Sequence, residues 1–203
     1  MTKVKLCGLT RICDIEAANE VCPEYIGFVF APKSKRFITP ERVKELKQQL
    51  SPHIQAVGVF VNAPLETVAN LLETGVIDMA QLHGEEDEAY IQRLRKHTAC
   101  PIIKAFRAEN PADMEKANES SADFVLLDSQ NGGSGTVFDW ALLEYIQRPY
   151  FLAGGLNVHN VTSAIQTFRP YAVDISSGIE KNGCKDPRKM AEFVLAVRKE
   201  REK

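Results

Sequence analysis

Short apolar segments alternate with amphipathic segments along the whole chain. The apolar segments are rich in valine, isoleucine, leucine and phenylalanine, which is typical of strands buried on both faces of a parallel sheet. The predicted strands are Val4–Cys7, Tyr25–Phe30, Gln55–Phe60, Met79–Leu82, Ile102–Phe106, Phe124–Leu127, Tyr150–Ala153 and Ala172–Ile175. Between them, apolar residues recur with the period of a helix, as in Pro40–Leu50, Leu65–Thr74, Glu86–His97 and Trp140–Gln147. The pattern therefore predicts eight strand–helix units in succession.

Polar residues mark where several of these helices begin. Thr39 precedes Pro40 and Asp186 precedes Pro187, and each pair is typical of a helix N-terminus. Asn157 is expected to open the helix that follows the strand Tyr150–Ala153. Because no linker or change of composition divides the chain, we expect a single domain over residues 1–203.

The succession of units favours a TIM (β/α)8 barrel of the α/β class, although an open doubly wound sheet has the same alternation. Side-chain parity favours the closed barrel, because successive strand residues face opposite sides of a sheet. Polar residues keep one parity in three strands, at Lys5 and Cys7, at Gln81 and His83, and at Asp174 and Ser176. In a closed barrel these side chains face the lumen or its mouth, and the first and last strands are neighbours. We therefore expect Lys5 to pair with Asp174.

Composition narrows the classes of function. Lys and Arg number 25 against 27 Asp and Glu, and no long basic run occurs, so we expect no nucleic-acid partner. The apolar segments are too short to span a bilayer and the N-terminus does not resemble a signal peptide, which predicts a cytoplasmic protein without membrane association. The 5 cysteines include no C-x-x-C pair, which favours reduced thiols over disulfides or a zinc site.

Two reactive side chains end predicted strands, where a closed barrel gathers its chemistry. Cys7 ends the first strand and precedes a turn glycine, and its thiol can act as a general base if neighbouring cations favour the thiolate. Asp128 follows the sixth strand and precedes the long, glycine-rich segment 129–136. Such a segment is typical of a lid that shields a carboxyl from water, so that Asp128 keeps its proton near neutral pH and acts as an acid.

Two turns after the seventh and eighth strands have the composition of phosphate cradles. One contains Gly154 and Gly155, and the other contains Ser176, Ser177 and Gly178 directly after Asp174 and Ile175. Glycine lets backbone N–H groups approach an anion, and these two positions match the phosphate site that recurs in TIM barrels. The residues therefore predict a phosphorylated small molecule as the substrate, with no metal or cofactor.

Three further residues are candidates for contact with that substrate. Arg36, in the segment after the second strand, offers a bidentate clamp to a carboxylate. Gln81 and His83, at the end of the fourth strand, either fill the lumen or touch the substrate. Lys33 and Lys35, close to Arg36, are interpreted as solvated.

These residues resemble the phosphoribosylanthranilate isomerase family of ribulose-phosphate-binding barrels over essentially the whole chain. The resemblance rests on Lys5-Leu6-Cys7-Gly8-Leu9-Thr10, Gly27-Phe28-Val29-Phe30, Ser34-Lys35-Arg36, Gln81-Leu82-His83-Gly84, Leu127-Asp128, Gly132-Gly133-Ser134-Gly135, Phe138-Asp139-Trp140, Ala153-Gly154-Gly155-Leu156 and Asp174-Ile175-Ser176-Ser177-Gly178-Ile179-Glu180. Ser134 stands where the family more often has threonine, and it keeps the hydroxyl.

The resemblance implies an Amadori rearrangement of N-(5′-phosphoribosyl)anthranilate in tryptophan biosynthesis. By this resemblance Asp128 protonates the furanose ring oxygen, and Cys7 then removes the C2′ proton. Arg36 holds the anthranilate carboxylate, and the two glycine/serine turns hold the phosphate. The reaction changes no oxidation state overall, so it needs no cofactor. Whether the protein is a monomer or a homodimer is left open by the sequence.

Two alternatives stay open. The related isomerase of histidine biosynthesis performs the same rearrangement, but its family uses aspartates as both acid and base, whereas Cys7 ends the first strand here. A catalytically silent barrel would keep the phosphate turns and bind a phosphorylated ligand without turnover. Indole-glycerol-phosphate synthase is disfavoured because its lysine-rich catalytic set is missing, and a cysteine hydrolase because no histidine is clearly placed to activate Cys7.

Overall fold

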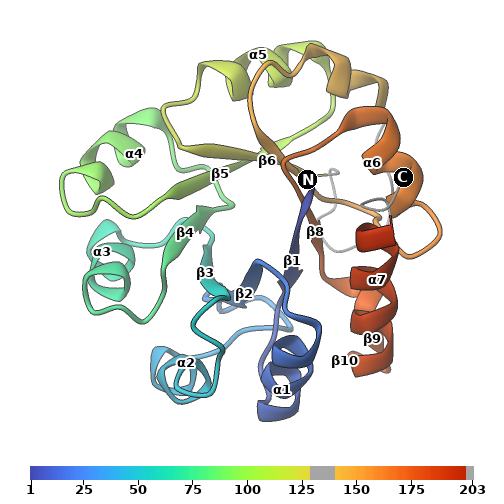
Figure 1. Ribbon diagram of the computed structural model, residues 1–203. Helices are drawn as coiled ribbons and strands as arrows, with labels where there is room; N and C mark the ends of the chain where they lie inside the picture. Colours follow the sequence, from blue (N-terminus) through green and yellow to red (C-terminus); the bar gives the residue numbers. More distant parts are fainter. Residues whose placement is uncertain (129–139, 200–203) are drawn as a thin grey trace.

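Parallel strands form a closed barrel in the computed structural model, which describes residues 1–128 and 140–199 (Figure 1). Its eight strands are β1 (Lys3–Cys7), β2 (Tyr25–Val29), β3 (Gln55–Phe60), β4 (Met79–Leu82), β5 (Ile102–Arg107), β6 (Phe124–Asp128), β7 (Tyr150–Leu152) and β8 (Ala172–Ile175). Each strand pairs with the next along the chain, and β8 pairs with β1 in a register that sets Asp174 opposite Lys5. The predicted TIM barrel is confirmed, and the alternative of an open sheet is wrong.

Helices surround the barrel on the outside (Figure 1). They are α1 (Ile12–Val21), α2 (Pro40–Lys47), α3 (Leu65–Glu73), α4 (Glu88–Arg95), α5 (Pro111–Glu119), α6 (Val161–Phe168) and α7 (Pro187–Lys199). Where the sequence predicted the helix Trp140–Gln147, the structure has a 3₁₀ helix, η1 (Trp140–Tyr145), which is shorter and more tightly wound. A second 3₁₀ turn, η2 (Ser177–Ile179), leads from β8 into a small hairpin made of β9 (Glu180–Lys181) and β10 (Cys184–Lys185).

Two of the three predicted helix starts are confirmed. The Thr39 hydroxyl accepts a hydrogen bond from the Arg42 amide at 3.4 Å, and the Asp186 carboxylate accepts one from the Lys189 amide at 3.1 Å. The third was placed too early, because α6 begins at Val161. Asn157 instead begins a turn before that helix, in which its carbonyl accepts a hydrogen bond from the Val161 amide at 3.1 Å.

The apolar side chains form two main clusters that alternate along the strands. Ile26 and Phe28 belong to the large cluster that also holds the buried faces of the helices. Tyr25 belongs to a separate cluster with Val57, Met79, Ile103, Leu126 and Phe151, whose parity directs them into the lumen. The lumen is therefore filled by side chains below the mouth, and polar residues of the same parity lie above this apolar layer.

A buried ion pair closes the barrel where its first and last strands meet. Lys5 has no exposed surface, and its ammonium lies 2.9 Å from the Asp174 carboxylate. Burial alone would lower the pKa of Lys5, but the attraction of Asp174 and of Cys7 outweighs burial and raises it. The predicted pairing of Lys5 with Asp174 is confirmed.

Removing one partner of this pair leaves the other charge buried without compensation. We expect Lys5→Met and Asp174→Asn each to lower the free energy of unfolding by about 3 kcal/mol or more, and the double variant to lose less than the sum. Urea unfolding measures the three values. Glu45→Gln, which breaks the exposed Arg42–Glu45 pair, is the control and should change stability by less than about 1 kcal/mol. Equal effects of the buried and exposed substitutions would contradict this account.

Within residues 1–128 and 140–199, no helix is long and apolar enough to cross a membrane.

Candidate active site

A cavity of about 660 Å³ opens at the carboxyl ends of the barrel strands. Every site residue predicted from the sequence lines it, namely Cys7, Arg36, Gln81, His83, Asp128, Gly154, Gly155, Asp174, Ser176, Ser177 and Gly178. These residues come from six different strands or the segments that follow them, so only closure of the barrel brings them together. A cavity of this size fits a small phosphorylated molecule.

Cys7 ends β1 and is buried at the wall of the cavity. Gly27 on β2 makes room for it, because a β-carbon at that position would lie 2.7 Å from the Cys7 sulfur. Burial raises the pKa of the Cys7 thiol, and the charge of Asp174 raises it further. Lys5 and Lys185 lower this pKa, but they do not outweigh burial. Two cations therefore act on Cys7, as the role of a general base requires, although burial outweighs their effect on its pKa.

Asp128 ends β6, one residue later than the strand predicted from the sequence. His83 lies beside it, with 3.5 Å between the His83 Nε2 atom and the nearer carboxylate oxygen. On the other side of the ring, the Gln81 amide nitrogen lies 2.9 Å from His83 Nδ1. The His83 ring therefore lies between the Gln81 amide and the Asp128 carboxylate. The segment 129–136, predicted to be a lid over Asp128, falls in the range 129–139, outside the described residues.

The two predicted phosphate turns pack against each other at the cavity wall. Gly154 and Gly155 have φ angles of +80° and +66°, in the left-handed region that favours glycine. A β-carbon on Gly178 would lie 2.6 Å from the Leu156 carbonyl oxygen, so the second turn touches the first. The side-chain amide of Asn160 donates to the Gly155 carbonyl at 3.0 Å and fixes this turn. The helix after β8 is only the three-residue η2, so an anion here relies on individual N–H groups.

One carboxylate oxygen of Asp174 accepts a hydrogen bond from Lys5, and the residue also lines the cavity. The second oxygen, Oδ1, is buried and accepts no hydrogen bond from any described residue. A buried acceptor without a donor lowers the stability of the fold.

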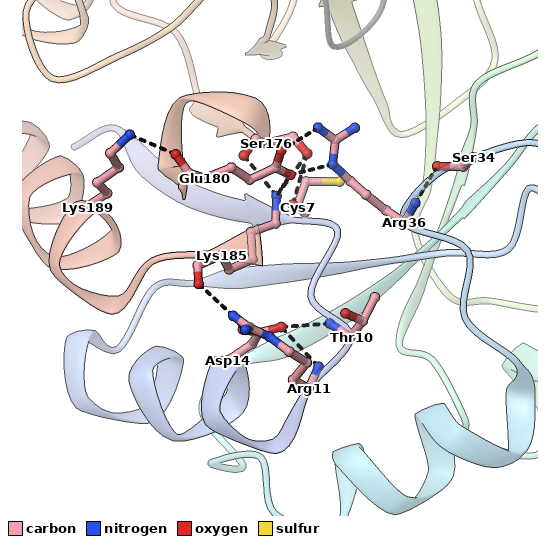
Figure 2. Close-up of polar contacts among 10 residues, drawn as sticks. All are labelled: Cys7, Thr10, Arg11, Asp14, Ser34, Arg36, Ser176, Glu180, Lys185 and Lys189. Atoms are coloured by element: carbon pink, nitrogen blue, oxygen red, sulfur yellow. Dashed lines mark hydrogen bonds and ion pairs between the residues drawn. The ribbon is translucent and has the colours of Figure 1, made fainter. Parts of the chain in front are cut away.

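Arg36 reaches the cavity from the segment between β2 and α2 and is held by Glu180 (Figure 2). Its Nε and Nη2 atoms lie 2.6 Å and 3.1 Å from the two carboxylate oxygens of Glu180, in a bidentate pair. The aliphatic stem of Arg36 passes over Gly8, where an added β-carbon would lie 2.4 Å from Arg36 Cδ. Gly8 therefore leaves the path that lets Arg36 reach the mouth of the barrel.

Several residues of the site were not predicted from the sequence. Glu180 ends the motif Asp174–Glu180 that carries the family resemblance, but no role was predicted for its side chain. No pattern in the sequence indicated a role for Lys185. Lys33, interpreted as solvated, is exposed and also lines the cavity. An apolar wall completes the cavity and is formed by Val29, Ala31, Pro32, Val59 and Val61. Such a wall suits a flat apolar group, and its residues lie on β2 and β3 or follow them.

Among the described residues, no group of three or more His, Cys, Asp or Glu side chains is placed to hold a metal ion.

Comparison with known proteins relates this geometry to a family. The sequence profile of N-(5'phosphoribosyl)anthranilate (PRA) isomerase matches residues 4–196. This chain belongs to that family. It is 44% identical over 204 residues to the N-(5'-phosphoribosyl)anthranilate isomerase of Endomicrobium trichonymphae, covering 98% of this chain and 99% of the relative. The same name and the same 44% identity hold for a relative from Thermoanaerobacter sp. strain X514, with 98% of each chain covered.

Solved structures of the family have the same fold. The phosphoribosyl anthranilate isomerase of Thermus thermophilus superposes with a TM-score of 0.89 at 35% identity, over 98% of this chain and 99% of the other. That of Thermotoga maritima gives a TM-score of 0.88 at 37% identity, over 98% and 100%. Another structure was solved with reduced 1-(o-carboxyphenylamino)-1-deoxyribulose 5-phosphate, and it gives a TM-score of 0.85 at 36% identity, over 98% and 100%. These matches confirm the resemblance found in the sequence.

The raised pKa of Cys7 makes a direct prediction about thiol reactivity. Because the thiolate is the reactive form, we expect iodoacetamide at neutral pH to modify Cys7 more slowly than the exposed Cys13, Cys22 and Cys184. Mass spectrometry of peptides after timed quenching measures each rate, and Cys7→Ser confirms the peptide assignment. Modification of Cys7 as fast as the exposed thiols would contradict a raised pKa at Cys7.

Proposed function

We propose that this protein isomerises N-(5′-phosphoribosyl)anthranilate to 1-(2-carboxyphenylamino)-1-deoxy-D-ribulose 5-phosphate, a step of tryptophan biosynthesis. One observation carries the proposal: a thiol on β1 and a carboxyl on β6 line the same cavity as an arginine and two glycine turns. Membership of the isomerase family over residues 4–196 supports the same reaction.

The cavity offers a matching group for each part of this substrate. Backbone N–H groups of the turns at Gly154–Gly155 and Ser176–Gly178 bind the phosphate. Arg36 binds the anthranilate carboxylate through the edge of its guanidinium that Glu180 does not use. The aromatic ring packs on the apolar wall, and the ribose lies near Asp174, which lines the cavity.

Asp128 and Cys7 act in succession on the ribose. Asp128 gives its proton to the furanose ring oxygen, the C1′–oxygen bond breaks, and a Schiff base forms with the anthranilate nitrogen. The Cys7 thiolate then takes the proton from C2′, which gives an enolamine. Loss of the C2′ hydroxyl proton and protonation at C1′ convert the enolamine to the ketone. These reaction steps redistribute protons and electrons within the substrate, so the reaction requires no cofactor.

His83 and Gln81 orient the acid. The His83 ring contacts the Asp128 carboxylate on one side, and its contact with the Gln81 amide on the other side fixes the orientation of the ring. The carboxyl is thereby held facing the ring oxygen of the substrate. The sequence left open whether these two residues fill the lumen or touch the substrate. Here they have a third role, which is to orient Asp128.

The wider setting follows from the same proposal. We infer a phosphorylated small molecule as the ligand, a cytoplasmic location, and either a monomer or a homodimer as the assembly. A solved relative from Thermotoga maritima is described as a dimeric enzyme from which monomers were generated, at 36% identity and a TM-score of 0.85.

Loss of substrate fluorescence tests the reaction directly. With substrate generated in situ, we expect the wild type to turn over, and Cys7→Ser and Asp128→Asn each to lose about 10²-fold to 10⁴-fold in kcat. Both variants keep the phosphate turns and Arg36, so they should bind the reduced product analogue with affinity close to that of the wild type. Near-normal turnover by one variant would remove that residue from catalysis. Wild-type protein that binds the analogue without turnover would instead indicate a silent binding barrel.

The pH dependence of kcat/KM follows from the raised pKa of Cys7. A general base must be deprotonated, and a raised pKa moves the thiolate fraction to higher pH than in a free cysteine. We therefore expect kcat/KM to rise with pH above neutrality until the thiol has titrated. Stopped assays in overlapping buffers give the profile. In Cys7→Ser the residual activity should lose this limb, because serine does not titrate there; a wild-type profile that is flat above neutrality would contradict the assignment.

A further inference from the structure

Two largely buried charged side chains of the hairpin β9–β10 have no part in the proposed reaction. Glu180 and Lys185 are partners across this hairpin, and the Lys185 ammonium lies 2.7 Å from a Glu180 carboxylate oxygen. Lys185 is almost wholly buried, and the side chain of Glu180 is only 16% exposed. Buried charges of this kind are expensive unless their contacts are complete, so their contacts indicate what they do.

Glu180 occupies one edge of the Arg36 guanidinium. The pair uses Nε and Nη2, and Figure 2 shows the remaining terminal nitrogen of Arg36 pointing away from Glu180. That nitrogen, Nη1, makes no hydrogen bond to any described residue, and Arg36 lines the cavity. A rigid guanidinium held at one edge presents its other edge in a fixed direction. Glu180 therefore determines where a substrate carboxylate can meet Arg36.

Lys185 connects the Arg36–Glu180 pair, which forms the carboxylate clamp, to the rest of the site. Besides Glu180, its ammonium donates to the Ser176 carbonyl at 2.8 Å and to the Ser176 hydroxyl at 3.2 Å. The Ser176 hydroxyl in turn donates to the Cys7 carbonyl at 3.0 Å. One buried ammonium thus joins the carboxylate clamp, the second phosphate turn and the strand end that carries Cys7 (Figure 2).

The backbone of the hairpin is tied to two helices. Arg11, at the start of α1, donates to the Lys185 carbonyl at 2.6 Å. Lys189 on α7 donates to the Glu180 carbonyl at 2.7 Å. These contacts hold Glu180 and Lys185 from outside the cavity, so their positions do not depend on a bound ligand.

The local charge balance also favours an acidic substrate group. Arg36 and Lys185 carry two positive charges against the single carboxylate of Glu180, which leaves one positive charge for the ligand. Burial alone would raise the pKa of Glu180, but hydrogen bonds and charge from Arg36 and Lys185 lower it. Glu180 therefore stays ionised, and it neutralises one cation without competing for the free edge of Arg36.

We propose that Glu180 and Lys185 are positioning residues that orient Arg36 for the substrate carboxylate and hold it in register with the phosphate turn. The proposal rests on the proposed function, since it assigns the carboxylate to Arg36. It predicts a specific defect: loss of either residue weakens recognition of the carboxylate much more than recognition of the phosphate.

The affinities of two ligands measure this loss of carboxylate recognition. One is reduced 1-(o-carboxyphenylamino)-1-deoxyribulose 5-phosphate, and the other is the same compound without the carboxyl group. We expect the wild type to bind the first about 10-fold or more tightly than the second, because an ionic hydrogen bond is lost. Glu180→Gln should reduce this ratio towards one and leave affinity for the carboxyl-free ligand nearly unchanged. Lys185→Met also removes the contacts with Ser176, so it should reduce the ratio and weaken the carboxyl-free ligand by a smaller factor than the carboxylated one. Isothermal titration calorimetry gives both constants.

Matched variants separate positioning from general damage to the fold. Lys185→Arg keeps the charge and should restore most of the ratio, whereas Lys181→Met, at an exposed position of the same hairpin, should not alter it. Arg36→Met should abolish the preference for the carboxylated ligand, and adding Glu180→Gln to Arg36→Met should not weaken binding of that ligand further. If Glu180→Gln does not fold, Glu180→Asp replaces it, since the shorter side chain keeps the charge but loses reach.

The outcomes distinguish the inference from the function on which it rests. A wild type that does not prefer the carboxylated ligand, or shows no turnover, would overturn the proposed function. A wild type that prefers this ligand and turns over, with the same preference in Glu180→Gln and Lys185→Met, would overturn the inference alone. Equal weakening of both ligands in these variants would also overturn it, because that result indicates a structural role.

Discussion

The hydrogen bonds between β1 and β8 close the sheet, and the whole site depends on that closure. They set Lys5 opposite Asp174 and Leu6 opposite Ile175, although almost the entire chain separates the two strands. In an open sheet Cys7 and Ser176 would lie at different edges, whereas here the Ser176 hydroxyl reaches the Cys7 carbonyl. The buried Lys5–Asp174 pair lies at this junction and gives it a register, because a shift by one residue would turn one of the two charges away from the lumen.

Burial and charge oppose each other at Cys7. The cavity wall excludes water from the thiol and raises its pKa, while Lys5 and Lys185 stabilise the thiolate. The thiolate of Cys7 is therefore a smaller fraction of the thiol at neutral pH, but it is a stronger base, which suits removal of a proton from carbon. Lys185 takes part in two tasks, because the same ammonium acts on Cys7 and holds the Glu180 that orients Arg36.

The sequence predicted the parts of the fold that depend on local pattern. Apolar segments predict every barrel strand, and the parity of Lys5 and Asp174 favours closure of the sheet. Glycines and serines after the last two strands identified the cavity wall, because those positions are fixed by barrel topology. Short-range signals were sufficient for these features.

The remaining features depend on contacts between distant residues or on a balance of opposing terms. Arg36 and Glu180 are far apart in the chain, so no local pattern shows that they pair. The sign of the Cys7 pKa shift depends on how deeply the thiol is buried, which spacing does not reveal. No local pattern indicates the buried contact of Lys104 with Glu86 either, which joins β5 to the segment after β4.

The central claim is that one substrate spans the mouth of the barrel from the arginine clamp to the glycine turns. The most direct test is a crystal structure of this protein with reduced 1-(o-carboxyphenylamino)-1-deoxyribulose 5-phosphate. We expect the phosphate on the backbone of Gly154 and Ser177, the carboxylate on the free edge of Arg36, and the second ribose carbon beside the Cys7 sulfur. A ligand with its phosphate bound away from both turns, or with its sugar carbons out of reach of Cys7, would contradict it.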